Sequence, residues 1–475
     1  MKPTIMKFGG TSVEGATAFQ NAARIVAERR ALRPVVIVSA MAGFTNALLG
    51  SVQQSLAGDA SGAASALEKH FERHVSVIDA LLDKQPERML EFVDHSRIEI
   101  IELLNAMAAG FSQDVWTSKL FSDAVVSYGE RLSAAMLAAV LLENKVSATD
   151  VDARLCVITD DDFGCAAPLF EETFRRTQEQ LNPLLESSCV PVLGGFIGST
   201  ITGKTTTLGR GGSDYSAAII GAALSAEEIQ IWTDVPGVLT ADPRVVPEAR
   251  TVPRLSFEEA AELAYFGAKV LHPKTLQPAI ERNIPVRICN SRAQESGSTV
   301  VVAETEKSPQ TVKAIAHKNG VTTVQVTSAR MLGAYGFLRA LFEVFDKHRT
   351  AVDVVTTSEV SVSLSLDDTS ALPSIVKELE ELGSVSVDGQ RAILCIVGEG
   401  LRTTPGIAAR IFSTISDINV SLISQGASRI NLTFAVEEAR AGEAVIRLHR
   451  EFFEKADEEE SAKRLETAGQ VSDFG

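Results

Sequence analysis

The 475-residue sequence has no excess of positive charge. It contains 45 Lys and Arg residues against 61 Asp and Glu residues, so its formal net charge is −16. A protein this acidic gains nothing from displacing the counterions of a polyanion, and we therefore predict that it does not bind nucleic acid. An anionic ligand must instead be held by a few local cations, which makes the position of each basic residue informative.

Cysteines and long apolar runs are also scarce. The cysteines show no C-x-x-C spacing, so we expect neither a disulfide framework nor a zinc site, but buried free thiols at Cys156, Cys165, Cys189, Cys289 and Cys395. No apolar run reaches the about 18 residues of a membrane-spanning helix. The N-terminal MKPTIMKFGG lacks the apolar core of a secretory signal. We therefore expect a soluble cytoplasmic protein.

Strand-like and helix-like segments alternate over residues 1–303. The runs PTIMKF and PVVIVSA are typical of strands buried in a parallel sheet, and a glycine turn and an amphipathic segment at 14–31 separate them. Similar strands recur at 155–159, 190–198, 228–234 and 286–290. The alternation predicts one large α/β domain with a mainly parallel sheet between helices.

The remaining sequence changes pattern and repeats. Residues 321–388 indicate strand, helix, strand, strand, helix, strand, and residues 392–453 repeat this order without the last strand. YGFLRALFEVFDKH aligns with PGIAARIFSTISDI, which supports an internal duplication of a βαββαβ unit. The predicted parts are a large α/β domain at 1–303, a linker at 304–311, a first βαββαβ unit at 319–389, a second such unit formed by 312–318 plus 390–455, and a disordered tail at 456–475.

Two glycine turns carry the chemistry. In KFGGTSV, Lys7 ends the first predicted strand and precedes Gly9 and Gly10. In LGRGGSD, Arg210 lies among glycines that lead into a helix opened by Ser213 and Asp214. Glycines at strand ends let backbone N–H groups approach a phosphate, and the guanidinium can grip a carboxylate or phosphate at two points.

Two other patterns need a different interpretation. GSTITGKT fits the nucleotide-binding pattern G-x-x-x-x-G-K-[ST], but the TTTLGRGG that follows Lys204 cannot begin a helix. We interpret this segment as a hairpin turn. His70 and His74 are one helical turn apart without the glutamate spacing of a zinc motif, and we predict that they lie on a solvated helix face.

Several motifs together resemble the aspartokinase family of the amino-acid kinase superfamily: KFGGTSV, VSAMAGFTN, SYGERLSA, TTTLGRGGSDYSAA, WTDVPGVLTADPR and FGAKVLHPKT. The repeated units resemble the paired ACT, ferredoxin-like regulatory modules of that family. MLGAYGFL and VDVVTTSEVSVSLSLD are most similar to its monofunctional, lysine-sensitive branch. The resemblance implies ATP-dependent phosphorylation of the β-carboxylate of L-aspartate, the first step toward lysine, threonine and methionine.

The resemblance also implies roles for single residues. Lys7 and Asp214 are the implied catalytic residues. The implied partners of L-aspartate are Ser39, Thr45, Glu130, Arg210, Gly211, Gly212 and Ser213. The implied partners of ATP are Lys7, Gly9, Gly10, Thr233, Asp234, Leu239, Arg244 and Lys269. Mg²⁺ is expected with ATP, but no metal site built by the protein alone.

The same resemblance implies feedback control by an amino acid, with lysine expected. Its implied partners are Met331, Phe337, Leu338, Val352, Asp353, Ser358 and Glu359. Ala334 and Ala351 replace hydroxyl residues that lysine-sensitive relatives use, which leaves two alternatives open, a reduced lysine response and a different effector. A homodimer through the ACT units is expected, and dimers that pair into tetramers are the alternative.

Two other functions are open at this point. One is an amino-acid kinase with a different acceptor, namely glutamate, acetylglutamate or a nucleoside monophosphate. The other is a catalytically inactive amino-acid sensor. Glu130 and the duplicated units argue against the first alternative, and the presence of Lys7, Arg210 and Asp214 argues against the second.

Overall fold

The chain divides into two compact units. The computed structural model describes residues 2–84, 86–111, 114–267, 273–304, 311–333 and 335–455. Unit 1 comprises residues 1–238, 253–257 and 270–304, and unit 2 comprises residues 239–252, 258–269 and 305–475. The sequence-predicted tail at 456–475 and most of the predicted linker lie outside the described residues.

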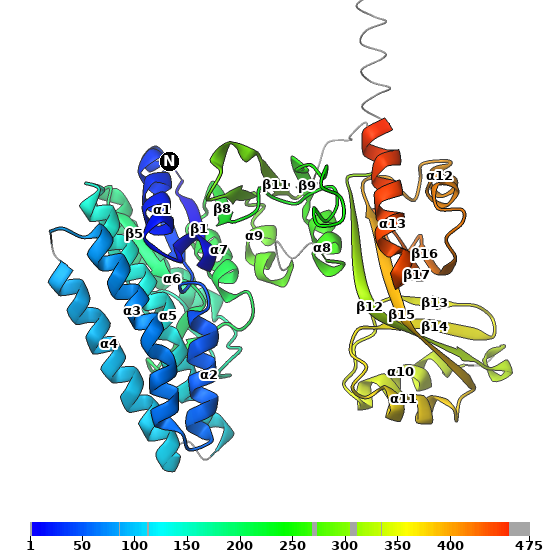
Figure 1. The fold of residues 1–475 in the computed structure, drawn as a ribbon, viewed down its shortest axis with the longest axis horizontal. Coiled ribbons are helices and arrows are strands. Elements are labelled where there is room, and N and C mark those ends of the chain that lie inside the picture. Colours follow the sequence, from blue (N-terminus) through cyan, green and yellow to red (C-terminus); the bar gives the residue numbers. More distant parts are fainter. Residues whose placement is uncertain are drawn as a thin grey trace, which may run out of the picture. The chain divides into compact units, whose positions relative to one another are not determined.

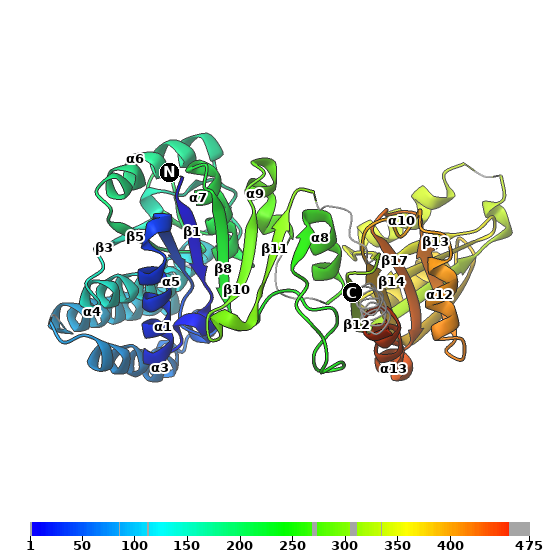
Figure 2. The same cartoon turned by 90° about the horizontal axis from the view of Figure 1, so that it is seen from above.

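A mainly parallel sheet forms the centre of unit 1, as predicted (Figure 2). Its strands follow the order β3-β5-β2-β1-β8-β10-β11-β9. They span β1 (Thr4–Phe8), β2 (Pro34–Val38), β3 (Ala148–Val151), β5 (Val190–Gly194), β8 (Glu228–Thr233), β9 (Arg254–Ser256), β10 (Val286–Asn290) and β11 (Ser298–Val302). Every residue of β1 and β2 is buried, which explains why both are mainly apolar, with Lys7 near the end of β1 as the charged exception.

Helices cover both faces of this sheet (Figure 2). One face carries α1 (Ala16–Glu28), α3 (Ala60–Leu81), α4 (Pro86–Ala106) and α5 (Val115–Glu143). The other face carries α6 (Phe170–Glu186), α7 (Gly212–Ala223) and α9 (Gln277–Glu281). On the first face, Phe8 and Val38 belong to one core with α1 and α5 side chains, and α2 (Phe44–Leu56) packs on α3 and α5.

Among the described residues, α5 alone is long and apolar enough, by length and composition, to cross a membrane. However, 83% of its most apolar 18-residue window is buried inside the protein, and core helices of soluble proteins pass the same test. The sequence-based statement that no segment reaches spanning length overlooked α5, because Glu130 and Arg131 interrupt its apolar residues.

The segment that mimics a nucleotide-binding motif is a hairpin, which confirms the sequence-based interpretation. Strands β6 (Ile197–Thr200) and β7 (Thr205–Thr207) pair antiparallel and join β4 (Ile158–Thr159) in a separate three-stranded sheet. Gly203 occupies the turn with φ +83°, a conformation that favours glycine. Lys204 is exposed and follows this turn, so no helix N-terminus stands behind it.

Two sequence-based expectations about burial are wrong. His70 and His74 lie on the buried face of α3, where Phe44 of α2 contacts both rings at centroid distances of 5.4 and 4.9 Å. Burial lowers the pKa of His74 to about 4, so the ring is neutral at pH 7 and packs as a core side chain. The flanking Lys and Glu residues suggested a solvated face. Conversely, among the five cysteines expected to be buried, Cys165 is exposed and Cys189 is only partly buried.

Unit 2 contains a six-stranded sheet in the order β13-β14-β12-β15-β17-β16 (Figure 1). Two long strands, β12 (Ala314–Thr327) and β15 (Ser384–Val397), run through its centre. Residues 314–318 of β12 pair with 393–397 of β15, and residues 323–327 pair with 384–388. This pairing supports the proposed crossover of 312–318 into the second regulatory unit. The outer strands are β13 (Val355–Thr357), β14 (Ser361–Leu366), β16 (Val420–Gln425) and β17 (Asn431–Glu437).

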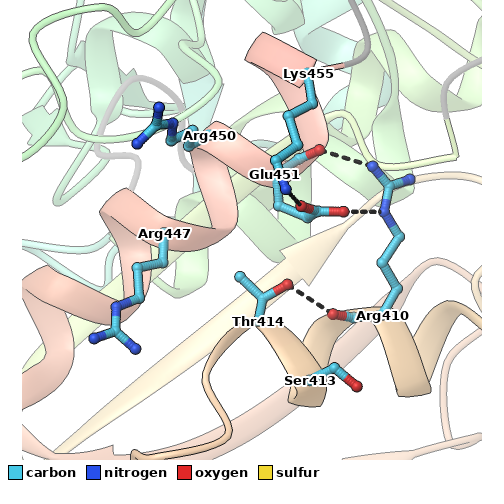
Figure 3. Close-up of a pocket in the computed structure, with 7 residues that line it drawn as sticks. All are labelled: Arg410, Ser413, Thr414, Arg447, Arg450, Glu451 and Lys455. Carbon is cyan, nitrogen blue, oxygen red and sulfur yellow. Dashed lines mark hydrogen bonds and ion pairs between the residues drawn. The ribbon is translucent and has the colours of Figure 1, made fainter. Parts of the chain in front are cut away.

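Each half of the unit 2 sheet has its own helices and hydrophobic core. They are α10 (Phe337–Lys347) and α11 (Leu372–Leu379) in the first half, and α12 (Ile407–Thr414) and α13 (Glu438–His449) in the second. Between α12 and the residues after α13, a cavity of about 470 Å³ is lined by basic side chains (Figure 3). Arg410 donates to Glu451 Oε1 at 2.7 Å, and Lys455 pairs with the same carboxylate at 2.7 Å. Because Arg410 and Lys455 are already paired with Glu451, we interpret these contacts as a link between α12 and the residues after α13.

The close approach of α5 to the end of β2 leads to a first prediction. A Cβ at Gly129 would lie 2.7 Å from the Ala40 Cβ, whereas a Cβ at Gly50, on the exposed side of α2, would meet nothing within 4 Å. Gly50→Ala should therefore stabilise the protein by about 0.5–1 kcal/mol through helix propensity. Gly129→Ala should destabilise it, because overpacking costs about 1–3 kcal/mol and exceeds that gain. Thermal unfolding should show Tm shifts of opposite sign. A raised Tm for both variants would show that the α5–β2 contact is not tight.

Candidate active site

A pocket of about 630 Å³ lies at the carboxyl ends of β1 and β2 in unit 1. The turn after β1, the turn after β2, α5 and the loop between β7 and α7 supply its walls. The carboxyl edge of a parallel sheet is the usual place for a ligand in such folds. The pocket brings together ten of the sequence-predicted residues: Lys7, Gly10, Ser39, Thr45, Glu130, Arg210, Gly211, Gly212, Ser213 and Asp214.

An ion pair between β1 and α7 crosses the floor of this pocket. Lys7 Nζ lies 2.6 Å from Asp214 Oδ1, and the two side chains are only 11% and 16% exposed. Asp214 is in the first turn of α7, so the carboxylate also lies near the positive end of that helix. At Gly10, a Cβ would lie 2.9 Å from the Ala40 carbonyl oxygen, which explains why glycine is needed beside Lys7.

Arg210 projects from a loop in which the residue on either side adopts a left-handed backbone conformation that favours glycine. Gly209 and Gly211 on either side of it have φ of +74° and +75°. The Arg210 side chain is exposed at the pocket, and no carboxylate among the described residues pairs with it. This guanidinium is therefore available for an anionic group of a ligand.

Glu130 places a buried carboxyl group in the wall of the pocket. It is 3% exposed, and its Oε1 accepts a hydrogen bond of 3.1 Å from the Ala40 N–H. Its Oε2 is buried and has no hydrogen-bond partner in the part of the chain that the structure describes. Burial raises the pKa of Glu130 to about 8, although the nearby charge of Lys7 opposes the shift. An unpartnered buried carboxylate oxygen is a suitable site for a cationic group of a ligand.

Sequence reasoning missed Asp123, which also lines the pocket. It lies two helical turns before Glu130 on the same face of α5 and is 3% exposed. Its carboxylate accepts hydrogen bonds from Gly164 and Thr207, and burial raises its pKa to about 6. The seven-residue spacing from Glu130, in an otherwise apolar helix, was the signal that could have revealed it.

The residues with an implied nucleotide role are divided between the two units. The Gly9 N–H donates to the Trp232 carbonyl at 3.0 Å, so Thr233, the last residue of β8, and Asp234 lie at the same sheet edge as Lys7. Leu239 and Arg244 instead belong to unit 2, where Arg244 pairs with Asp242 at 2.6 Å and its side chain is 88% exposed. Lys269 lies outside the described residues. The nucleotide role of these residues remains a prediction.

The residues with an implied effector role lie in the first half of unit 2. Met331, Phe337 and Val352 pack against its hydrophobic core, whereas Leu338, Ser358 and Glu359 are exposed. Ala334 lies outside the described residues, and Ala351 is exposed.

Asp353, also in the effector set, is surrounded by polar partners. It accepts a hydrogen bond from the Tyr265 hydroxyl, and its Oδ2 lies 3.8 Å from the Lys318 ammonium. Burial and the neighbouring Asp367 raise the pKa of Asp353 to about 7. A ligand ammonium at this carboxylate would therefore meet Lys318 as a competitor.

Comparison with known proteins agrees with this architecture. Residues 2–290 match the amino acid kinase family, and residues 394–452 match the ACT domain family. The chain is 37% identical to lysine-sensitive aspartokinase 3 of Escherichia coli over 459 residues, covering 95% of this chain and 99% of the relative. It is 38% identical to the chloroplastic aspartokinase 1 of Arabidopsis thaliana over 469 residues, covering 95% of this chain and 80% of the relative.

Solved structures give the same result. The chain is similar to the crystal structure of E. coli aspartokinase III in complex with aspartate and ADP, the R-state, with a TM-score of 0.79 and 36% identity. It is equally similar to the T-state complex of that enzyme with lysine and aspartate, with a TM-score of 0.80. Both comparisons cover 95% of this chain and 100% of the solved chain.

Proposed function

This chain belongs to the aspartokinase family of amino acid kinases, and from that premise we propose that it phosphorylates the β-carboxylate of L-aspartate with ATP. The product is 4-phospho-L-aspartate, the first intermediate of the pathway to lysine, threonine and methionine. The observation that carries the proposal is the pocket itself. It presents an unpaired guanidinium, a buried carboxylate with a free oxygen and the Lys7–Asp214 pair within one cavity.

These groups match the charges of aspartate one by one. Arg210 holds the α-carboxylate, because a planar guanidinium binds a carboxylate through two parallel hydrogen bonds. Glu130 holds the α-ammonium with its free Oε2. Ser39 and Thr45 supply hydroxyl groups at the pocket wall, and the residues from Gly211 to Ser213 supply backbone at the N-terminus of α7. The β-carboxylate then points toward Lys7.

The reaction needs charge neutralisation and no general base. The β-carboxylate has a reference pKa of about 3.9 and is already ionised at pH 7. The obstacle is repulsion, since an anion must attack a polyanion. Lys7 stabilises the negative charge of the transferring phosphoryl group, and Asp214 fixes the ammonium at the site through their 2.6 Å contact.

ATP would bring Mg²⁺ with it. The described residues contain no group of three metal-ligating side chains. A single carboxylate in the pocket is enough for Mg²⁺, which proteins usually bind through one or two carboxylates and the phosphates of the substrate. Asp214 is the carboxylate that would hold it, and the bound ion would neutralise phosphate charge. Gly9, Gly10, Thr233, Asp234, Leu239, Arg244 and Lys269 are proposed for the nucleotide.

The regulatory part of the proposal concerns unit 2. The match to an ACT domain and the duplicated sheet support control by an amino acid, with lysine as the proposed effector. We assign it to the set that contains Met331, Phe337, Leu338, Val352, Asp353, Ser358 and Glu359. A homodimer through the ACT units is proposed, with a tetramer as the alternative. The free state of every cysteine is compatible with the proposed cytoplasmic location.

The central test measures ADP formation with L-aspartate and Mg²⁺, for wild type and for Lys7→Ala. We expect the wild type to turn over aspartate and Lys7→Ala to lower kcat about 10²-fold or more with a small change in KM, since the ammonium acts in the transition state. Lys204→Ala is the matched control, because it removes the lysine of the hairpin that mimics a nucleotide-binding loop. It should leave kcat unchanged.

The outcomes separate the alternatives. If the enzyme phosphorylates glutamate, acetylglutamate or a nucleoside monophosphate but not aspartate, then that compound is the phosphoryl acceptor and aspartate is not. ATP binding without transfer to any acceptor would identify an inactive sensor. A rise in KM alone for Lys7→Ala would refute its transition-state role.

The raised pKa of Glu130 predicts how aspartate binding depends on pH. Below about pH 8 the carboxyl is protonated in the free enzyme, and it must lose this proton to hold an ammonium. The KM for aspartate should therefore rise as the pH falls between about 8.5 and 6.5, approaching tenfold per pH unit. Glu130→Gln should raise KM and remove this dependence. Steady-state kinetics would check this, and a flat wild-type profile would contradict it.

A change in the regulatory unit should strengthen lysine inhibition. Ala351→Ser restores a hydroxyl at an exposed position beside Val352 of the proposed effector site. One added hydrogen bond is worth about 0.5–1.5 kcal/mol, so the half-inhibitory lysine concentration should fall about 2- to 13-fold. Activity without lysine should not change, and threonine serves as the control effector. Unchanged or weaker lysine inhibition would show that position 351 is not part of the site.

A further inference from the structure

The loop that carries Arg210 has little to hold it in place. Residues 208–212 include three glycines, and glycine has the greatest freedom to lose when a backbone is ordered. Arg210 itself is exposed and has no partner among the described residues. If the loop were disordered before binding, the entropy lost on ordering it would weaken the binding of any ligand that contacts Arg210. A loop that is already fixed avoids this loss.

The root of the loop is fixed by Asp123. Asp123 Oδ2 accepts a hydrogen bond of 2.9 Å from the Thr207 N–H, and Oδ1 accepts one of 2.8 Å from the Thr207 hydroxyl. Thr207 ends β7, three residues before Arg210. Oδ2 also accepts a 2.9 Å hydrogen bond from the Gly164 N–H, so a third segment is tied to the same carboxylate.

The segment at residues 164–166 also contacts the loop directly. The Ala166 N–H donates to the Thr207 carbonyl at 2.9 Å. The Cys165 Sγ lies 3.1 Å from the position that a Cβ on Gly209 would take, so the segment is in contact with the loop backbone. Asp123 therefore joins α5, residues 164–166 and the start of the loop with one side chain.

Asp123 is not well explained as a stabilising residue. It is 3% exposed and pairs with no cation in the described part of the chain, since Lys119 on the preceding turn pairs with Asp162. A buried carboxylate without a cation is costly, and burial accordingly raises its pKa to about 6. Its two oxygens are also occupied by Thr207 and Gly164, which leaves them unsuited to contact the substrate.

We propose that Asp123 is a positioning residue that fixes the separation between Arg210 and Glu130. Both carboxylates project from the same face of α5, seven residues apart, so one rigid helix carries the ammonium site and the anchor of the carboxylate site. Asp123 thereby keeps the two proposed binding groups for the α-carboxylate and the α-ammonium of aspartate in the same pocket. This inference rests on the proposed function, in which Arg210 and Glu130 bind aspartate.

The test compares Asp123→Ala with Asp123→Asn. The alanine variant releases Thr207 and Gly164, and the KM for aspartate should rise about 10- to 100-fold, the effect of misplacing a binding group by about 1 Å. The KM for ATP and kcat should change less than about threefold. In the asparagine variant the amide oxygen can accept both N–H groups and the amide NH₂ can donate to the Thr207 hydroxyl. It should therefore return KM to within about fivefold of wild type.

Two controls distinguish positioning from a loss of stability. Val125→Ala creates a cavity in α5 at a buried residue that does not line the pocket. It should lower Tm at least as much as Asp123→Ala and leave the KM for aspartate unchanged. The Asp123→Ala and Arg210→Ala changes should be strongly non-additive in KM, because both remove the same contact with substrate.

The outcomes are separable from those of the proposed function. A wild-type enzyme that does not phosphorylate aspartate overturns the proposed function. An active wild type whose Asp123→Ala variant keeps its KM overturns the positioning role, and so does additivity with Arg210→Ala. If Asp123→Ala does not fold, Thr207→Val tests the same link, with Thr207→Ser as the variant that keeps the hydroxyl. An unchanged KM in Thr207→Val would then overturn the role.

Discussion

The ion pair between Lys7 and Asp214 is the contact on which the rest of the active site depends. It joins the first strand of the sheet to the helix that follows the glycine loop, with 2.6 Å between the charged atoms. In a protein with net charge −16, a cation for an anionic substrate must be held in place locally. Glycine at position 10 and a short, fully buried strand bring Lys7 to that place, and the helix N-terminus supports its partner.

Helix α5 carries two equally buried carboxyl groups, Asp123 and Glu130, whose hydrogen-bond partners differ. Glu130 and Asp123 share one face and are both 3% exposed, yet their pKa values differ, at about 8 and about 6. Asp123 accepts three hydrogen bonds that favour its charged form, whereas Glu130 keeps one oxygen without a partner. The first is fitted to hold protein backbone, and the second is fitted to receive a charge from outside.

Local patterns were enough to predict the parallel sheet, the duplicated unit and the hairpin at 197–207, because strand periodicity and glycine turns act over a few residues. Glycine turns at strand ends also indicated Lys7, Arg210 and Asp214, which line the pocket, whereas Glu130 in the middle of α5 was indicated only by the family resemblance. Local patterns did not predict features that depend on contacts between segments distant in the sequence. His70 and His74 are buried by α2, and no local charge pattern could reveal that neighbour. Asp123 acquires its role from segments 41 and 84 residues away in sequence.

The segment 239–252 shows most clearly what local patterns do not reveal. The family resemblance implies a nucleotide role for Leu239 and Arg244, which stays a prediction, and the segment that carries them folds as part of unit 2. Its Thr240 carbonyl accepts a hydrogen bond from the Ile315 N–H of β12, its hydroxyl bonds to the buried His449 of α13, and Val246 enters the hydrophobic core beneath them. Packing with β12 and α13 therefore decides where this segment folds, and the partners of Thr240 there lie at least 70 residues further along the chain. A local motif carries no information about contacts over that distance.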